Sequence, residues 1–291
     1  MSRPPLSVVI PVREGLAEIA PVLEGLLPAA EAVGAEVLVV GELEADASPP
    51  SSLVRLISMP VTNMLALRRH ALASARGELV AVGEDHAVPR ANWCETVIRA
   101  HAERPEAMAV VGCLVNATDA TLAGRSNFRA FASPWQPPMP ELPSDRPPPS
   151  STLSFKRPAL AGIESQAPGW FEASLIPSLF GEGKMAADDR IVVDHFQDHG
   201  SLWSIRNSYD SARSSYGYEH ARLDRAGRRR LARWAIGGIP RGLRAEAREA
   251  LGGTRIPAPE AGLISLIAIA AGVGGGAGAL FGPGRSADRV A

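Results

Sequence analysis

Hydrophobic residues in the first third of the chain form short runs, and longer segments with helical spacing separate these runs. The runs Leu6 to Val12, Glu36 to Gly41 and Leu79 to Gly83 are almost entirely apolar. Runs of this kind are typical of strands buried in a parallel sheet. Between them, apolar residues recur with helical spacing from Leu16 to Val33 and from Asn63 to Ala75. Strands that alternate with helices in this way predict βαβ units.

The same alternation continues further along the chain. Apolar residues at 54–59 and 107–115 predict two more strands, and a helix is expected from Trp93 to Ala102. We therefore predict an α/β fold with a mostly parallel central sheet flanked by helices.

The segment 134–149 contains eight prolines in sixteen residues, which excludes a helix and a central strand. Patterned sequence resumes directly after it, so we expect a linker or a loop that lies over a site. Strands are predicted at 152–157 and 190–194, and a helix at 170–180. Residues 201–250 are predicted to be helical in two or three pieces.

The C-terminal part of the chain is apolar and follows an arginine-rich segment. Ala261 to Phe281 contains no charged residue and is about long enough to cross a bilayer. A spanning helix, an interfacial membrane segment and a soluble or flexible tail all fit this pattern. Arginines crowd between residues 221 and 255. They fit a solvated helical face, and they also fit contact with anionic lipid.

Composition narrows the class of protein. A formal net charge of −1 over 291 residues gives no electrostatic case for nucleic acid as the principal partner. Two cysteines, Cys94 and Cys113, do not make a disulfide scaffold, so a reducing compartment is expected. The first apolar run is short and contains Pro11, which does not fit a signal peptide. We therefore expect a cytoplasmic location.

Three polar side chains, Glu84, Asp85 and His86, follow directly after a buried strand. Open α/β sheets bind ligands at the carboxyl ends of their strands, and all three groups can bind a metal. On an extended chain Glu84 and His86 would point the same way and Asp85 the opposite way. A solvated strand end is the alternative interpretation.

The order of the segments resembles family 2 glycosyltransferases, which have the GT-A fold. The resemblance covers roughly residues 6–220. It begins with "SVVIPV" and continues through "EVLVVGELEAD", "NMLALRRHALASARGELVAV" and "EDHAVPRANW". It ends with "STLSFKRPAL", "GWFEASL" and "RIVVDHF". Each piece is short and degenerate, and their order and spacing together make the match specific.

The resemblance implies a role for the polar trio. It takes the place of the Asp-x-Asp motif, where a divalent cation meets the diphosphate of a nucleotide sugar. We predict that Glu84 and His86 bind the metal and that Asp85 contacts the sugar or ribose. An imidazole among the ligands favours Mn²⁺ over Mg²⁺, which prefers oxygen ligands. His195 has a counterpart in many relatives that ligates the metal or touches the diphosphate.

Three further residues are implied to contact the nucleotide sugar. They are Pro11, which lies in the first strand motif, Glu42 and Arg69. Glu42 stands where the family usually has an Asp that accepts a hydrogen bond from the base, although a solvated acidic loop also fits. Arg69 matches a family arginine close to the nucleotide, whereas Arg68 points about 100° away on a helix.

Glu172 stands at the helix start where the family carries its catalytic acidic residue, which acts as the base. Inverting transfer needs a carboxylate that takes the proton from the acceptor hydroxyl. The motif match favours Glu172 over Glu164 and Glu182. The alternative interpretation is an ordinary carboxylate in a first helical turn, which the helix dipole stabilises.

Together these features predict a GT-A domain at 1–218 and a membrane-associating tail at 219–291. The domain would hold a nucleotide-sugar half at 1–116 and an acceptor half at 117–218, with the proline-rich loop in the latter. The expected activity is inverting transfer from a nucleotide-diphosphate sugar to a glycan or lipid-linked acceptor at the inner membrane face. The segment "RLARW" has Arg230 where processive synthases carry glutamine, which favours a single transfer.

A second interpretation is a catalytically weak or silent relative that acts as a partner in a glycan-assembly complex. Three departures from the family pattern favour it. They are Glu42 for Asp, Glu84-x-His86 for Asp-x-Asp, and Thr152 where relatives commonly carry Asn.

Overall fold

The structure is a computed structural model that describes most of the chain. It covers residues 3–13, 15–44, 46–60, 64–139, 141–142, 148–163, 171–197, 199–251 and 256–289, without the side chains of 171–174 and 240–251. The chain divides into two compact units. The α/β unit contains Met1–Ala117, Pro134–Ala167 and Phe171–Phe196, and the helical unit contains Thr118–Ser133, Pro168–Trp170 and Gln197–Ala291. The functional division at residue 218 stays a prediction, because these units group residues by contact and not by activity.

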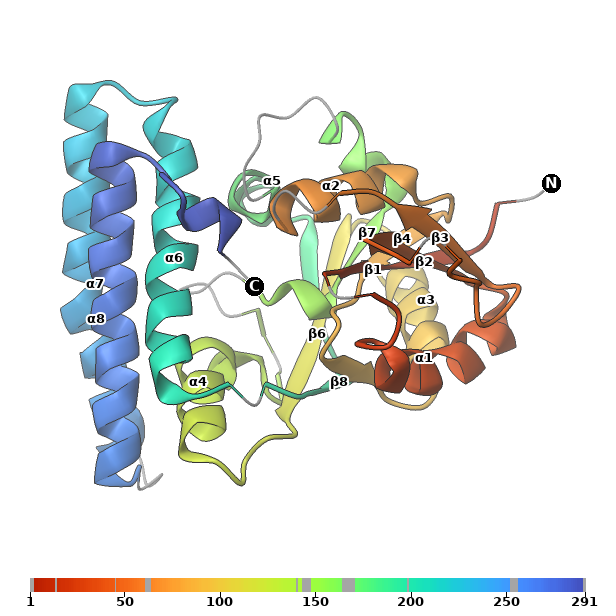
Figure 1. The fold of residues 1–291 in the computed structure, drawn as a ribbon, viewed down its shortest axis with the longest axis horizontal. Coiled ribbons are helices and arrows are strands. Elements are labelled where there is room, and N and C mark those ends of the chain that lie inside the picture. The colour runs from red at the N-terminus through yellow and green to blue at the C-terminus, as the bar shows by residue number, and fades with distance from the viewer. Residues whose placement is uncertain are drawn as a thin grey trace. The chain divides into compact units, whose positions relative to one another are not determined.

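The α/β unit is built on one eight-stranded sheet (Figure 1). Its strands are β1 (Leu6–Val12), β2 (Glu36–Gly41), β3 (Val54–Ser58), β4 (Leu79–Val82), β5 (Ala87–Pro89), β6 (Ala109–Asn116), β7 (Leu153–Lys156) and β8 (Met185–His195). The strand order across the sheet is β3-β2-β1-β4-β7-β6-β8-β5. The α/β class predicted from the sequence is therefore confirmed.

The prediction of a mostly parallel sheet is wrong, because the sheet is mixed. β1 pairs in parallel with β2 and β4, as do β2 with β3 and β6 with β8. β7 lies between β4 and β6 and runs antiparallel to both, and β5 runs antiparallel to β8. The apolar pattern of β7 marks it as a strand, but its direction depends on the path by which the chain returns to the sheet.

Helices cover both faces of this sheet (Figure 1). They are α1 (Ala20–Val33), α2 (Met64–Ser74), α3 (Trp93–Glu103) and α5 (Phe171–Gly181). α1 begins later than its apolar pattern predicts, with Pro21 in its first turn, where a missing N–H is tolerated. It ends at Gly34, whose φ of 66° is the left-handed conformation that glycine adopts without strain.

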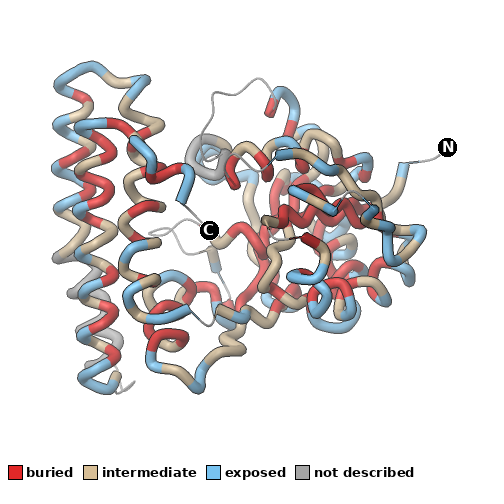
Figure 2. The backbone as a smooth tube through the Cα atoms, in the orientation of Figure 1, coloured by how far each residue is buried: buried red, intermediate tan, exposed pale blue. Residues whose placement is uncertain are grey.

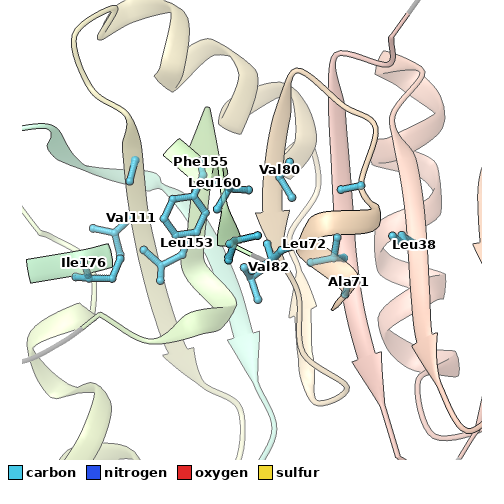
Figure 3. Close-up of a cluster of buried hydrophobic side chains, with 14 of the residues drawn as sticks. Leu38, Ala71, Leu72, Val80, Val82, Val111, Leu153, Phe155, Leu160 and Ile176 are labelled. Carbon is cyan, nitrogen blue, oxygen red and sulfur yellow. The ribbon is translucent and has the colours of Figure 1, made fainter. Parts of the chain in front are cut away.

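The main hydrophobic core lies between the sheet and the helices α2 and α5. Figure 3 shows Leu72 of α2, Ile176 of α5 and the strand residues Val82, Leu153 and Phe155 meeting in one cluster. Leu153, Phe155 and Val82 are completely buried. This packing fixes the carboxyl end of β4, after which Glu84 to His86 follow.

The helical unit contains α4 (Leu122–Ala132), α6 (Ser201–His220), α7 (Arg225–Leu251) and α8 (Ala258–Phe281). α8 approaches α6 closely at two glycines. A Cβ added to Gly274 would lie 2.2 Å from the carbonyl oxygen of Tyr209, and a Cβ added to Gly278 would lie 2.3 Å from that of Arg213. The start of α8 is held by Glu260, which is 1% exposed and pairs with Arg129 of α4 at 2.6 Å. The glycines that weaken α8 as an isolated helix are therefore what lets it pack here.

His101 gives the α/β unit a predicted pH dependence. It is 3% exposed, and its Nε2 lies 3.0 Å from the Ser154 hydroxyl. Burial, together with the nearby charge of Lys156, lowers the pKa of His101 to about 4. The unfolded chain binds a proton near pH 6.5, so the unfolding free energy should fall as the pH drops from 6.5 towards 4. This group alone should account for about 3 kcal/mol.

Urea unfolding at pH 7 and at pH 4 measures this contribution. His101→Gln should remove about 3 kcal/mol of the difference between the two pH values. His70→Gln, at an exposed position of α2, should keep the wild-type difference. Equal pH dependence in wild type and His101→Gln would contradict the prediction.

Candidate functional site

Backbone pairing brings the turn after β4 next to the end of β1 and the end of β8. The Gly83 amide donates to the Val9 carbonyl at 2.8 Å, which extends the β1–β4 pairing by one residue. The chain then turns, and β5 pairs with the end of β8 so that Ala87 lies opposite His195. The Phe196 amide also donates to the His86 carbonyl at 2.8 Å. His195 is thereby held beside the turn that carries Glu84 and His86.

Glu84, His86 and His195 form a compact group of possible metal ligands. One ligand atom from each lies within 4.8 Å of the other two. The Glu84 Oε2 atom is 3.7 Å from Nε2 of His86 and 3.9 Å from Nε2 of His195. The two imidazole rings meet edge to face with centroids 4.6 Å apart. The side chain of His86 is 31% exposed, against 12% for His195, so His86 is the more open member of the group.

The Asp85 carboxylate contacts Nδ1 of His86. A carboxylate in this position fixes the orientation of an imidazole and leaves its Nε2 free to face a ligand. The predicted contact of Asp85 with the sugar or ribose stays a prediction.

Arg68 is a site residue that the sequence interpretation set aside in favour of Arg69. Its Nη2 atom lies 2.8 Å from Oε1 of Glu84, and its Nη1 donates to the Ser150 hydroxyl at 3.0 Å. The Arg68 side chain is only 7% exposed, whereas Arg69 is half-buried. Arg68 falls on the apolar face of α2 with Met64 and Leu72. A charged residue on an apolar helix face indicates a buried partner, and this signal was available in the sequence.

The charges of the site act on one another. Burial raises the pKa of the Glu84 carboxyl, but the positive charges of Arg68, His86 and His195 outweigh it and leave this pKa lowered. Burial lowers the pKa of His86, but the hydrogen bond that its ring donates to the Asp85 carboxylate and the charge of Glu84 leave this pKa raised. Glu84 is therefore held ionised, and a cation that binds His86 must compete with a proton.

The donor set fits a divalent transition metal. It offers one carboxylate and two imidazoles, a combination that Mn²⁺ accepts and that suits Mg²⁺ less well. Among the residues that the structure describes, no other group of three or more acidic, histidine or cysteine side chains brings its ligand atoms within 4.8 Å of one another.

The remaining predicted residues occupy different places. Pro11 is buried in β1, opposite Val40, and Glu42 is exposed directly after β2. Because β1, β2 and β4 are parallel, Pro11 and Glu42 lie at the same edge of the sheet as Glu84. Glu172 lies in the first turn of α5, and its side chain is outside the described residues. The roles of all three stay predictions.

A pocket of about 480 Å³ lies elsewhere in the α/β unit, lined by Arg3, Glu78 and Arg157 among others. Glu78 precedes β4, so this pocket is at the amino ends of the strands. The ligand group at the carboxyl end of β4 is therefore the candidate functional site.

No known family model matches the sequence, and no curated protein sequence is detectably similar to it. Solved structures do match. A mannosyltransferase, PcManGT from Pyrobaculum calidifontis in complex with GDP-Man and Mn²⁺, has a TM-score of 0.55 at 18% identity. The match covers 94% of this chain and 87% of that one. The chain shares the fold of this mannosyltransferase.

A second solved structure with a weaker likeness is TarS from S. aureus in complex with UDP-GlcNAc. Its TM-score is 0.47 at 15% identity, and the match covers 72% of this chain and 64% of that one.

Proposed function

We propose that the chain is an inverting glycosyltransferase of family 2 with a GT-A fold, which transfers one sugar from a nucleotide-diphosphate sugar. The observation that carries this proposal is the group of Glu84, His86 and His195 at the carboxyl end of β4. The likeness of the fold to a mannosyltransferase whose structure holds GDP-Man and Mn²⁺ supports it.

In this proposal Glu84, His86 and His195 hold a divalent cation, Mn²⁺ before Mg²⁺. When bound, the cation neutralises negative charge on the departing nucleotide diphosphate. Arg68 keeps Glu84 ionised and in place through its contact at 2.8 Å. Asp85 holds the His86 ring, and Pro11, Glu42 and Arg69 contact the donor.

Glu172 is the proposed general base. The acceptor hydroxyl oxygen forms a bond to the anomeric carbon while the bond from that carbon to the diphosphate oxygen breaks. The hydroxyl proton passes to the Glu172 carboxylate, and the bonding electrons leave with the nucleotide diphosphate. The sugar is attached with inverted configuration because the oxygen attacks from the face opposite to the leaving group.

The proposed acceptor is a glycan or a lipid-linked sugar at the cytoplasmic face of a membrane. α8 is long and apolar enough to cross a membrane by length and composition, and half of its most apolar stretch is buried inside the protein. A soluble protein can contain such a helix, so the membrane location belongs to the proposal.

Calorimetric titration of the purified full chain with GDP or UDP tests the donor site. One of the two nucleotides, GDP or UDP, should bind, and its binding should require Mn²⁺. His86→Ala should weaken this binding by at least roughly 10- to 100-fold, because loss of a residue that only supports a metal ligand already has an effect of that size. His70→Ala, at an exposed histidine of α2, is the matched control and should bind as the wild type does.

A silent partner in a glycan-assembly complex is the competing function. It is favoured if neither nucleotide binds with Mn²⁺ present. Unchanged Mn²⁺-dependent binding in His86→Ala would instead overturn the metal assignment while leaving a nucleotide site in place.

A further inference from the structure

One side of α8 is apolar and exposed along most of its length. The apolar stripe consists of Leu266, Ile269, Val273 and Leu280, which are 52%, 41%, 49% and 39% exposed. Their spacings of three, four and seven residues place them on one line of the helix. The adjoining Phe281 is 76% exposed. Figure 2 shows exposed segments recurring along this helix.

The other sides of α8 are occupied by its neighbours. Gly274 and Gly278 approach the backbone of α6 at Tyr209 and Arg213. Gly272 faces α7, because a Cβ there would lie 2.2 Å from Cγ1 of Ile239. At 100° per residue, the apolar stripe points away from α6 and lies beside the side of α8 that faces α7, where its residues stay exposed. It is therefore a free surface within the described part of the helical unit.

α7 adds a cationic border to this stripe. A Cβ added to Gly276 of α8 would lie 2.9 Å from Cγ1 of Ile236, so Ile236 borders the stripe, and it is 50% exposed. Arg229 and Arg225 precede Ile236 by seven and eleven residues, which puts them on the same line of α7. Both are exposed. We call the apolar stripe together with Ile236, Arg229 and Arg225 the docking face.

The packing of α8 argues against a span. Its 24 residues measure about 36 Å, enough to cross a hydrocarbon core of about 30 Å. However, α8 packs along α6, which carries Arg206, Asp210 and Arg213. A spanning α8 would draw these charges to the depth of the acyl chains, where each is costly.

We propose that the docking face lies flat on a membrane surface that contains anionic lipid. The apolar stripe enters the boundary between headgroups and acyl chains, and Arg225 and Arg229 bind lipid phosphates. A second copy of the chain suits this face less well, because residues 225–239 contain no carboxylate that could pair with the arginines. This inference deepens the membrane location within the proposed function and does not require sugar transfer.

Flotation of the purified full chain with vesicles tests the inference, without donor or metal. Vesicles of phosphatidylcholine and phosphatidylglycerol should carry the protein, and phosphatidylcholine alone should carry much less. Arg225→Gln/Arg229→Gln should weaken binding about 30-fold, from roughly 1 kcal/mol for each cation. The control Arg76→Gln/Arg99→Gln removes two cations of the α/β unit and should leave binding unchanged.

The apolar stripe has its own pair of variants. Leu266→Gln/Val273→Gln should abolish flotation, whereas Leu202→Gln, at an 80% exposed leucine of α6, should not affect it. Circular dichroism verifies that each variant is folded.

An alkaline carbonate wash should release the bound wild type. Retention after that wash would show a spanning helix and overturn the inference. Failure of the wild type to bind vesicles would also overturn it. A wild-type dimer that Leu266→Gln/Val273→Gln converts to a monomer would overturn it as well. Transfer activity without vesicle binding would overturn this inference alone, and vesicle binding without transfer would leave it standing.

Discussion

Glu172→Gln is expected to slow sugar transfer by a factor of about 10² to 10⁴, equivalent to roughly 3 to 5 kcal/mol of barrier. Glutamine keeps the volume of the side chain and most of its hydrogen bonding but cannot accept the proton of the acceptor hydroxyl. Donor binding should stay within a few-fold, because the proposed function assigns it to Glu84, His86 and His195 with their cation and to Glu42 and Arg69, and not to Glu172. Release of nucleotide diphosphate from donor and acceptor measures the rate, and calorimetry measures donor affinity.

The matched control is Glu182→Gln just beyond the same helix. Glu182 is exposed, pairs with Lys184 at 2.7 Å and accepts a hydrogen bond from Ser178 at 2.9 Å. Its loss should leave the rate close to that of the wild type. Should Glu172→Gln also transfer at the wild-type rate, Glu172 is an ordinary carboxylate in a first helical turn.

Arg68→Met is expected to lower the unfolding free energy of the metal-free protein by about 3 to 5 kcal/mol. Methionine fills a similar volume but leaves the largely buried Glu84 carboxylate without its closest cation, at 2.8 Å in the wild type. Urea unfolding in the presence of a chelator, followed by circular dichroism, gives this difference.

A second substitution separates the ion pair from simple packing. Arg68→Met/Glu84→Gln removes the unpaired charge and should recover most of the lost stability. Arg69→Met, one residue along α2, should change stability by less than about 1 kcal/mol. If the double variant were as unstable as Arg68→Met alone, the loss would come from packing of α2 and not from the Glu84 charge.

Local pattern was enough to place most elements of the α/β unit. β2 occupies Glu36–Gly41, the apolar run predicted for it, since a buried strand reads as a continuous apolar segment. α4 received no prediction, although Thr121 caps it by accepting a hydrogen bond from the Gly124 amide at 2.9 Å. A threonine before a helical segment is a recognisable N-terminal signal. The strand at β7 was predicted, but its antiparallel direction could not be, because a four-residue strand has the same pattern in either direction.

For the site, the neighbouring sequence likewise predicts individual ligand residues, but it does not predict the contacts between segments that are far apart in the chain. Glu84 and His86 follow from their place after a strand, whereas their proximity to His195 depends on the pairing of β5 with β8. The choice between Arg68 and Arg69 was made by resemblance, and one residue on a helix changes the direction of a side chain by about 100°. The Arg68–Glu84 contact connects α2 to the end of β4, which no local pattern encodes.

The sheet order has a consequence for how the protein is made. A nascent chain leaves the ribosome from its N-terminus, so the parallel strands β3, β2, β1 and β4 are available for pairing once Val82 has emerged. His195 ends β8, the last strand of the sheet to be synthesised, and β8 fills the gap between β6 and β5. A translation product that ends between His86 and His195 therefore contains the strands of the first half of the sheet but only two of the three candidate metal ligands. The complete group of candidate ligands is present only after the chain has been synthesised as far as His195.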